Sequence, residues 1–187
     1  MARLERTDRF FGYYPATVAV ITVQTPGARN LMSAGWHSAV SMHPPMYGVA
    51  VGPERATHPL LREAGRFAVN FLPFEFSREI QGAGVYSYHD GRDKFDRLGL
   101  KVYSGALDTL ILEEAYLAYE IDQVQFVPFG DHDWVVGEVR QVHYHPEAFE
   151  DFKLTGEVAA VYLGRATYQE LQGEVRTHPP ELFRDAE

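Results

Sequence analysis

The main constraint on the fold is a series of short, β-type segments with few helical stretches between them. Residues 17–23 form a short β-branched run that ends at the turn Thr25-Pro-Gly, as a buried strand does. Further extended segments are predicted at residues 30–41, 46–51, 66–72, 115–126, 133–144 and 157–163. Many strands at short spacing without strand–helix–strand alternation predict a mainly β protein, an antiparallel barrel with a few short helices.

Two strands carry finer signals. In residues 115–126, Leu117, Tyr119 and Ile121 alternate with Glu120 and Asp122, which predicts one buried face and one polar face. The turn Pro-Phe-Gly-Asp joins this segment to residues 133–144, so the two are predicted to pair antiparallel.

Helical signals are brief. A helix is predicted at residues 60–64, ended by a glycine, and another at residues 74–81. Residues 82–105 are polar and glycine-rich, which predicts a long loop with one helical turn near Lys94; loops of that length are usually functional or mobile. With no repeats and no sign of a second domain, residues 1–187 are predicted to form one domain with a polar tail at 172–187.

Composition narrows the possible functions. The chain has 26 acidic and 17 basic side chains, and a formal charge of −9 opposes a nucleic-acid backbone as the main partner. It has no cysteine, which excludes disulfides, thiolate nucleophiles and sulfur-ligated iron or zinc, so any redox chemistry would belong to a bound cofactor. No signal peptide and no membrane-spanning run are evident, and a cytoplasmic location is expected.

An anion site is one interpretation of the start of the first helix. Backbone N–H groups at a helix start favour an anion, the Thr57 hydroxyl can bond an oxygen, and Arg55 can clamp one with two hydrogen bonds. The alternative is that Thr57 is only the N-cap and that Arg55 is solvated.

Three other polar stretches each have a functional and a structural interpretation. Residues 30–45 interleave small polar side chains with one tryptophan, which suits a planar ring but also suits an ordinary strand with a core tryptophan. His132 lies between two turn aspartates and could donate to a ring edge, although a lone turn histidine is usually structural. His143 and His145 share one strand face, but no third ligand is evident, so no metal is predicted.

Taken in order, these stretches resemble the flavin reductase-like FMN-binding proteins, a group that includes flavoredoxins and the reductase components of two-component monooxygenases. The resemblance runs from about Tyr14 to Tyr168. Its carriers are Asn30-x-Met-Ser-Ala with Trp36, Ser41-x-x-Pro-Pro, Arg55-x-Thr57, Phe67-x-Val-Asn-Phe, Lys94-Phe95, and Gly130-Asp-His132 with Gly137-Glu-Val139.

The resemblance implies a split β-barrel of antiparallel Greek-key type that forms a homodimer with FMN at the subunit interface. It assigns to the isoalloxazine ring and the ribityl chain Asn30, Met32, Ser33, Ala34, Gly35, Trp36, His37 and Ser38. It assigns to the phosphate Ser41, Arg55, Thr57 and His58, with Lys94 reaching the phosphate or a second ligand. Tyr162 would lie beside the cofactor, and His132 would face the flavin or the nicotinamide as the catalytic residue.

The implied activity is hydride transfer from NADH or NADPH to flavin, with reduced flavin passed to a partner oxygenase. One alternative is a flavoredoxin-type electron carrier that holds FMN tightly and exchanges electrons with protein partners. Another is a non-enzymatic barrel that binds a small ligand. Neither a nucleic acid nor a membrane is expected as a partner.

Overall fold

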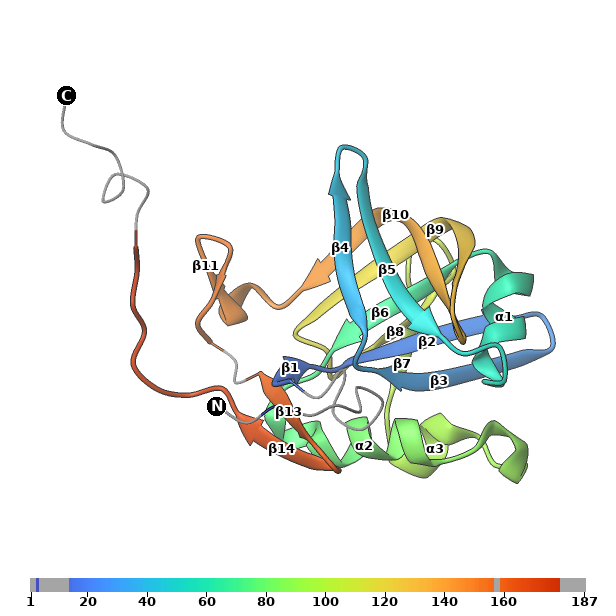
Figure 1. Ribbon diagram of the computed structural model, residues 1–187, viewed down its shortest axis with the longest axis horizontal. Helices are drawn as coiled ribbons and strands as arrows, with labels where there is room; N and C mark the ends of the chain where they lie inside the picture. Colours follow the sequence, from blue (N-terminus) through green and yellow to red (C-terminus); the bar gives the residue numbers. More distant parts are fainter. Residues whose placement is uncertain (1–2, 4–13, 157–158, 179–187) are drawn as a thin grey trace.

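The computed structural model describes residues 3, 14–156 and 159–178 (Figure 1). The strands are β1 (Ala16–Thr17), β2 (Ala19–Thr25), β3 (Ala28–Ala34), β4 (His37–Met42), β5 (Pro45–Val51), β6 (Phe67–Phe71), β7 (Val102–Ser104), β8 (Leu110–Leu112), β9 (Leu117–Phe129), β10 (His132–Tyr144), β11 (Phe149–Glu150), β12 (Lys153–Leu154), β13 (Ala160–Gly164) and β14 (Thr167–Glu170). The α-helices are α1 (Thr57–Ala64), α2 (Ser77–Val85) and α3 (Lys94–Leu98), and the 3₁₀ turns are η2 (Phe74–Phe76), η3 (Tyr88–Asp90) and η4 (Pro146–Ala148).

The predicted mainly β fold is confirmed as an antiparallel barrel. Seven strands form one sheet in the order β3-β2-β6-β9-β10-β5-β4, and every pairing in it is antiparallel. The two strands at the ends of this order, β3 and β4, are joined in the chain by only Gly35 and Trp36. This short link brings the end of β3 close to the start of β4 without pairing the two strands. The N–H of Ala50 in β5 donates to the carbonyl of Trp36 at 2.9 Å and so extends the β4–β5 pairing into the link.

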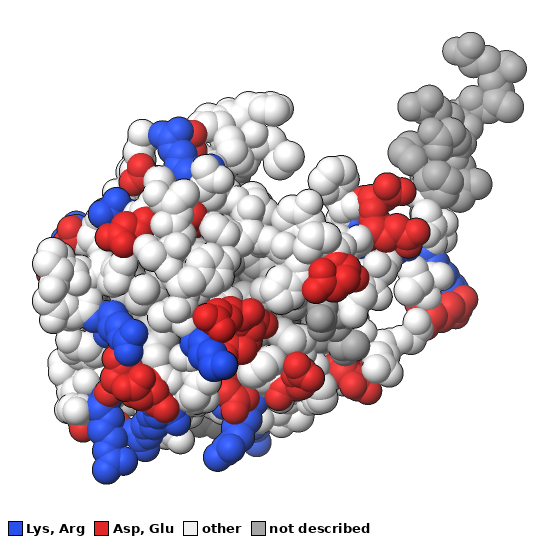
Figure 2. All heavy atoms as spheres, turned by 180° about the vertical axis from the view of Figure 1, so that it is seen from behind, with Lys and Arg blue, Asp and Glu red and all other residues white. Residues whose placement is uncertain are grey.

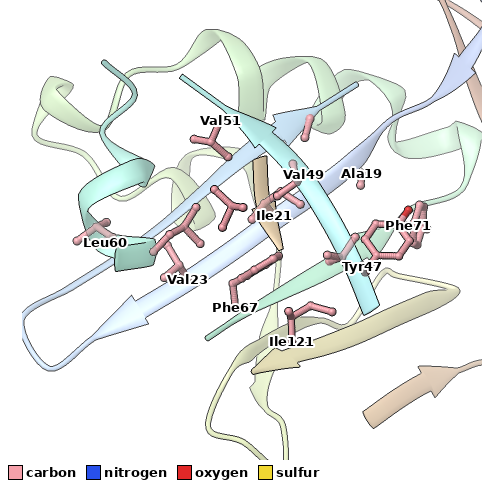
Figure 3. Packing of buried hydrophobic residues seen from close by; sticks show 14 of the residues in the cluster. Ala19, Ile21, Val23, Tyr47, Val49, Val51, Leu60, Phe67, Phe71 and Ile121 are labelled. Carbon is pink, nitrogen blue, oxygen red and sulfur yellow. The ribbon is translucent and has the colours of Figure 1, made fainter. Parts of the chain in front are cut away.

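The interior of the barrel is an apolar core drawn from most of its strands (Figure 3). Along β2, Ala19, Ile21 and Val23 point into this core, while Val20 joins a second cluster outside the barrel with residues of α2, α3 and β8. Because β2 is covered on both faces, its sequence is an almost continuous apolar run. The buried strand predicted at residues 17–23 is thus confirmed from Ala19 onward, whereas Thr17 is half-buried in β1.

Helices and the β7–β8 hairpin cover the outer face of this part of the sheet, and here one prediction was right only in part. Residues 82–105 were expected to be a long loop with one helical turn near Lys94. That turn is confirmed as α3, but α2 continues to Val85, and η3 and β7 also form, so the segment is more regular than expected. Capping sets the ends of α3: Asp93 accepts the N–H groups of Phe95 and Asp96 at its start, and Gly99 ends it in the left-handed conformation. Figure 1 shows α2 and α3 side by side beneath β3.

The polar face of β9 is also less open than its alternation indicated. Leu117, Tyr119 and Ile121 pack in the barrel core as predicted, but Glu120 on the other face is fully buried. Its carboxylate accepts hydrogen bonds from the N–H groups of Ala106 and Leu107, from the Thr109 hydroxyl and from the His143 ring. Burial raises the pKa of Glu120, but these hydrogen bonds outweigh burial and leave the pKa below its usual value.

His143 is therefore part of a structural network. Its Nε2 lies 2.7 Å from the Glu120 carboxylate and its Nδ1 lies 3.1 Å from the Tyr103 hydroxyl. Among the described residues, no group of three His, Asp or Glu side chains is arranged to hold a metal ion.

The surface carries mixed charge. On the face drawn in Figure 2, Lys and Arg side chains are interspersed with Asp and Glu. Within the described part of the chain, no helix has both the length and the apolar character needed to cross a membrane.

Candidate functional site

A cavity of about 420 Å³ lies beside β3, where three segments of the chain meet. The first is β3 with the turn that follows it, the second is the loop before α1, and the third runs from the end of α2 to Lys94; His132 adds a side chain from β10. Of the predicted site residues, this cavity brings together Asn30, Met32, Ser33, Ala34, Gly35, Trp36, Arg55, Thr57, Lys94 and His132.

β3 forms one wall of the cavity because it is an edge strand of the sheet. One side of its backbone is thus not used by the ladder with β2. The Leu31 carbonyl points to that free side, where it accepts a proton of Lys94, and strand alternation turns the peptide groups of Ser33 the same way. Because Ser33, Ala34 and Gly35 have small side chains or none, a ligand in the cavity can approach the backbone at this wall closely.

The start of α1 differs from its prediction in the identity of the N-cap residue. Thr57 is the first helical residue and not the N-cap; the N-cap is Ala56, which makes no side-chain capping hydrogen bond. The Thr57 hydroxyl accepts a hydrogen bond from the Asn30 side-chain amide at 2.9 Å, and it keeps its own proton to donate. Arg55 is exposed and pairs with Glu54 at 3.1 Å, so its guanidinium is solvated but lines the cavity.

Asn30 is buried, with only 2% of its surface exposed. Its nitrogen is used by Thr57, but its oxygen Oδ1 is buried without a hydrogen-bond partner among the described residues. An unsatisfied buried acceptor is costly, which makes this atom a place for a ligand donor.

Lys94 brings a buried positive charge to the same end of the cavity. It is 6% exposed, and its ammonium donates to the carbonyls of Leu31 at 2.6 Å and Ala83 at 2.7 Å. Burial lowers the pKa of Lys94 to about 8, partly offset by the nearby charge of Asp90. An ammonium has three protons, so two carbonyls leave one donor for a ligand.

The other end of the cavity is aromatic. The rings of Trp36 and His132 lie with their centroids 5.2 Å apart, tilted by 56°. His132 Nδ1 is 2.8 Å from a carboxylate oxygen of Asp131, and that hydrogen bond holds the pKa of the Asp131 carboxyl below its usual value. This hydrogen bond orients the His132 ring, and the second ring nitrogen, Nε2, remains available to a ligand.

Five of the predicted residues lie outside this cavity. His37 is half-buried and held by the Tyr47 hydroxyl at 2.7 Å and the Thr17 carbonyl at 3.2 Å, and burial lowers its pKa. Ser38 and Ser41 lie on β4, which does not line the cavity.

His58 turns away from the cavity as well. Its Nε2 lies 2.7 Å from a carboxylate oxygen of Asp133, and its ring packs edge-on against Phe126. Tyr162 lines a smaller neighbouring cavity of about 200 Å³, which shares Ser33 and Gly35 with the first.

The cavity also contains residues that sequence reasoning missed. They are Ala50, Gly52, Glu54, Ala56 and the segment 83–89. The only signal for that segment was its place in a glycine-rich stretch whose length suggested a functional loop.

Known proteins resemble this chain over most of its length. An uncharacterized protein of Aeropyrum pernix is 35% identical over 141 residues, which cover 75% of this chain and 53% of that protein. An NADH-dependent FMN reductase of Streptomyces nodosus subsp. asukaensis is 31% identical over 138 residues, 72% of each protein. The crystal structure of an FMN-binding protein from Thermus thermophilus with bound 1-cyclohex-2-enone is 31% identical, with a TM-score of 0.84 over 95% of this chain and 97% of that one.

The family is given by a match that spans the barrel and the cavity. A model of the family described as "Flavin reductase like domain" matches residues 11–171. The chain belongs to the flavin reductase-like family.

Proposed function

We propose that this protein binds FMN in the cavity beside β3 and reduces it with NADH or NADPH. The observation that carries the proposal is the polarity of the cavity: a buried ammonium, a threonine hydroxyl and an unsatisfied amide oxygen at one end, and a tryptophan–histidine pair at the other. These are the groups that a ligand with an anion at one end and a planar ring at the other requires.

The length of β3 supports this assignment. A strand rises by about 3.3 Å per residue, so the five steps from Asn30 to Gly35 span roughly 17 Å. Lys94 and Thr57 would hold the phosphate, and the Asn30 oxygen would accept from a ribityl hydroxyl. The small wall from Ser33 to Gly35 would lie along the ring.

FMN, when bound, supplies the ring that accepts a hydride from the nicotinamide. The chain contributes position and electrostatics. Peptide N–H groups on the free side of β3 would stabilise negative charge on the edge of the ring. His132, oriented by Asp131, would position the nicotinamide through Nε2, while Trp36 would exclude water from that end.

We also propose that the protein is a homodimer. β4 is the last strand of the sheet, and Trp36, Val40 and Met42 on or next to it are 41%, 47% and 76% exposed. Unpaired edge strands with exposed apolar side chains are typical of interfaces. If two copies paired through β4, then His37, Ser38 and Ser41 of one protomer would lie nearer to the cofactor bound by its partner. The acceptor of the electrons would be a partner oxygenase or a redox protein.

A small carbonyl compound is a second candidate ligand for the ring end. The protein of Thermus thermophilus was solved both with 1-cyclohex-2-enone and with p-hydroxybenzaldehyde. In the neutral ring whose Nδ1 donates to Asp131, His132 Nε2 is an acceptor, and the hydroxyl of p-hydroxybenzaldehyde is a donor of the right kind for it.

Binding tests the cofactor assignment. In a fluorescence titration, Thr57→Val should weaken FMN binding by about 1–3 kcal/mol, because it removes a hydroxyl donor to a charged phosphate. Thr167→Val, an exposed threonine on β14, is the matched control and should bind as the parent does. Equal FMN affinity in all three proteins would refute the assignment of the phosphate to the α1 end of the cavity.

Stopped-flow kinetics test the role of His132. We expect His132→Ala to slow bleaching of bound FMN by NADH or NADPH more than it raises the dissociation constant of FMN. His145→Ala is the control: this histidine follows the last residue of β10 and lines a separate cavity, so its loss should change neither quantity. If neither nicotinamide bleaches the flavin of the parent protein, the carrier alternative replaces the reductase.

A further inference from the structure

Lys94 is buried and yet lines open space on two sides. It is one of three lysines in the chain, and the other two, Lys101 and Lys153, are exposed. Lys94 lines the cavity beside β3 and also a groove of about 720 Å³, which lies between the β2–β3 turn and residues 88–94. A molecule in either space can therefore meet the Lys94 side chain.

The hydrogen bonds of Lys94 leave one direction at its nitrogen open. The nitrogen donates to the carbonyls of Leu31 at 2.6 Å and Ala83 at 2.7 Å. A neutral amine keeps two N–H groups for these carbonyls, and its lone pair takes the third direction, which no hydrogen bond to the described residues occupies. A neutral lysine amine with a free lone pair is a nucleophile toward carbonyl carbons.

Burial makes this neutral form accessible. It lowers the pKa of Lys94 to about 8, and the nearby charge of Asp90 offsets only part of the effect. At pH 8 about half of Lys94 is neutral, against roughly 0.3% of a lysine with the ordinary pKa of 10.5. An arginine at this position would stay charged and could not react.

We infer that Lys94 forms a reversible Schiff base with small aldehydes that carry a phosphate or another anionic group. The amine nitrogen bonds to the carbonyl carbon, and the carbonyl oxygen leaves as water with the two amine hydrogens, so no electrons are transferred. A protonated imine is again a cation and still donates to one of the two carbonyls, whereas an acylated amine is neutral. The surroundings therefore favour aldehydes over acylating agents, and the one lost hydrogen bond favours reversal.

The anionic group is argued from the charge of the groove. Arg29 and Arg92 line it together with Lys94, and Asp93 is the acidic residue of its lining. Asp93 is already paired with Arg29 at 2.6 Å, so the exposed guanidinium of Arg92 is free to attract an anion beside the amine. This site lies away from the tryptophan–histidine end of the cavity, and its chemistry needs no bound flavin, so the inference goes beyond the proposed function.

Borohydride trapping tests the inference on the full chain. The protein is incubated at about pH 8 with pyridoxal phosphate, or with pyridoxal, which lacks the phosphate, and borohydride then reduces any imine to a stable secondary amine. Peptide mass spectrometry gives the labelling rate of each lysine, so that Lys101 and Lys153 are internal controls. We expect Lys94 to be labelled at least tenfold faster than either, and pyridoxal phosphate to label it at least threefold faster than pyridoxal. Arg92→Glu should remove that preference for the phosphate.

Equal labelling of the three lysines would overturn the inference, and so would binding of pyridoxal phosphate without a trapped adduct at Lys94. Equal rates for the two aldehydes would refute the anionic requirement. Lys94→Arg keeps the charge and should abolish the fast labelling; if that variant does not fold, the ratio among the three lysines of the parent still decides. Saturating FMN should slow the labelling of Lys94 at least tenfold. Labelling that stays fast with FMN bound would instead refute the placement of the FMN phosphate beside Lys94 and leave the Schiff base standing.

Discussion

The buried ammonium of Lys94 makes a specific prediction about pH. Burial lowers its pKa from 10.5 to about 8, and at about 1.4 kcal/mol per pKa unit this is roughly 3 kcal/mol of disfavoured charge. A phosphate beside the ammonium would restore the charged form and raise that pKa. FMN binding should then take up a proton once the pH exceeds about 8.

The size of the effect follows from linkage. If FMN returns the pKa of Lys94 to its ordinary value, the FMN dissociation constant should rise up to about 25-fold between pH 7 and about 9.5. The sign is fixed: below pH 8 the free protein is already protonated at Lys94, whereas above it each binding event must first recruit a proton.

The assay is a fluorescence titration of FMN over this pH range, with riboflavin and Lys94→Met as controls. Riboflavin lacks the phosphate and reports any titration of the ring, and Lys94→Met lacks the ammonium. Parallel pH profiles for FMN in the parent and in Lys94→Met would refute the reasoning, because another group would then be responsible.

The same pKa makes an independent prediction for the protein without ligand. The unfolded chain holds the Lys94 proton up to about pH 10.5, whereas the folded chain releases it near pH 8. Folded stability should thus rise with pH in this window, by about 2 kcal/mol from pH 7 to about 9.5 relative to Lys94→Met. Urea unfolding at the two pH values measures the difference, and a constant offset between the two proteins would contradict it.

Three further substitutions test the scaffold by urea unfolding. Asp133→Ala should destabilise by about 1–3 kcal/mol, because it leaves a buried histidine nitrogen without its acceptor, whereas Asp131→Ala in the exposed turn should leave stability unchanged. Glu120→Gln should cost about 2–4 kcal/mol, because an amide cannot accept all the hydrogen bonds that the buried carboxylate accepts. Gly48→Ala should cost about 1–3 kcal/mol, because a Cβ at that position would overlap the Trp134 ring. An unfolding midpoint equal to that of the parent would contradict the prediction for Asp133→Ala, Glu120→Gln or Gly48→Ala.

Strand order in the chain was predictable because it depends on local patterns. The continuous apolar run of β2 predicted that both of its faces are buried. The turn after Phe129 predicted that β9 pairs with β10. The short Gly35–Trp36 link brings the end of one edge strand close to the start of the other, although β3 and β4 do not pair.

The polar interior was harder to predict because it depends on contacts between distant segments. Glu120 looks like a surface residue until the turn at residues 106–109 covers it. Lys94 looks like a loop cation until α3 and α2 enclose it, and Thr57 looks like a cap until Asn30 reaches its hydroxyl across 27 positions of chain. The helix-start pattern identified Thr57 as a candidate, and the family resemblance identified Asn30 and Lys94, but burial decides their chemistry.

For the stretch Asp131-His132-Asp133, the position at which β10 begins determines which side chain faces the cavity. Because β10 begins at His132, alternation sends the side chains of His132 and Asp133 to opposite faces of the sheet. His132 thus faces Trp36 and the cavity, while Asp133 faces α1 and pairs with His58. Asp131 precedes the strand and is free to bend back to His132 Nδ1. The two aspartates therefore have separate roles, one in orienting the ring at the cavity and one in fastening α1 to the barrel, and substitution of Asp131 should alter nicotinamide kinetics without altering stability.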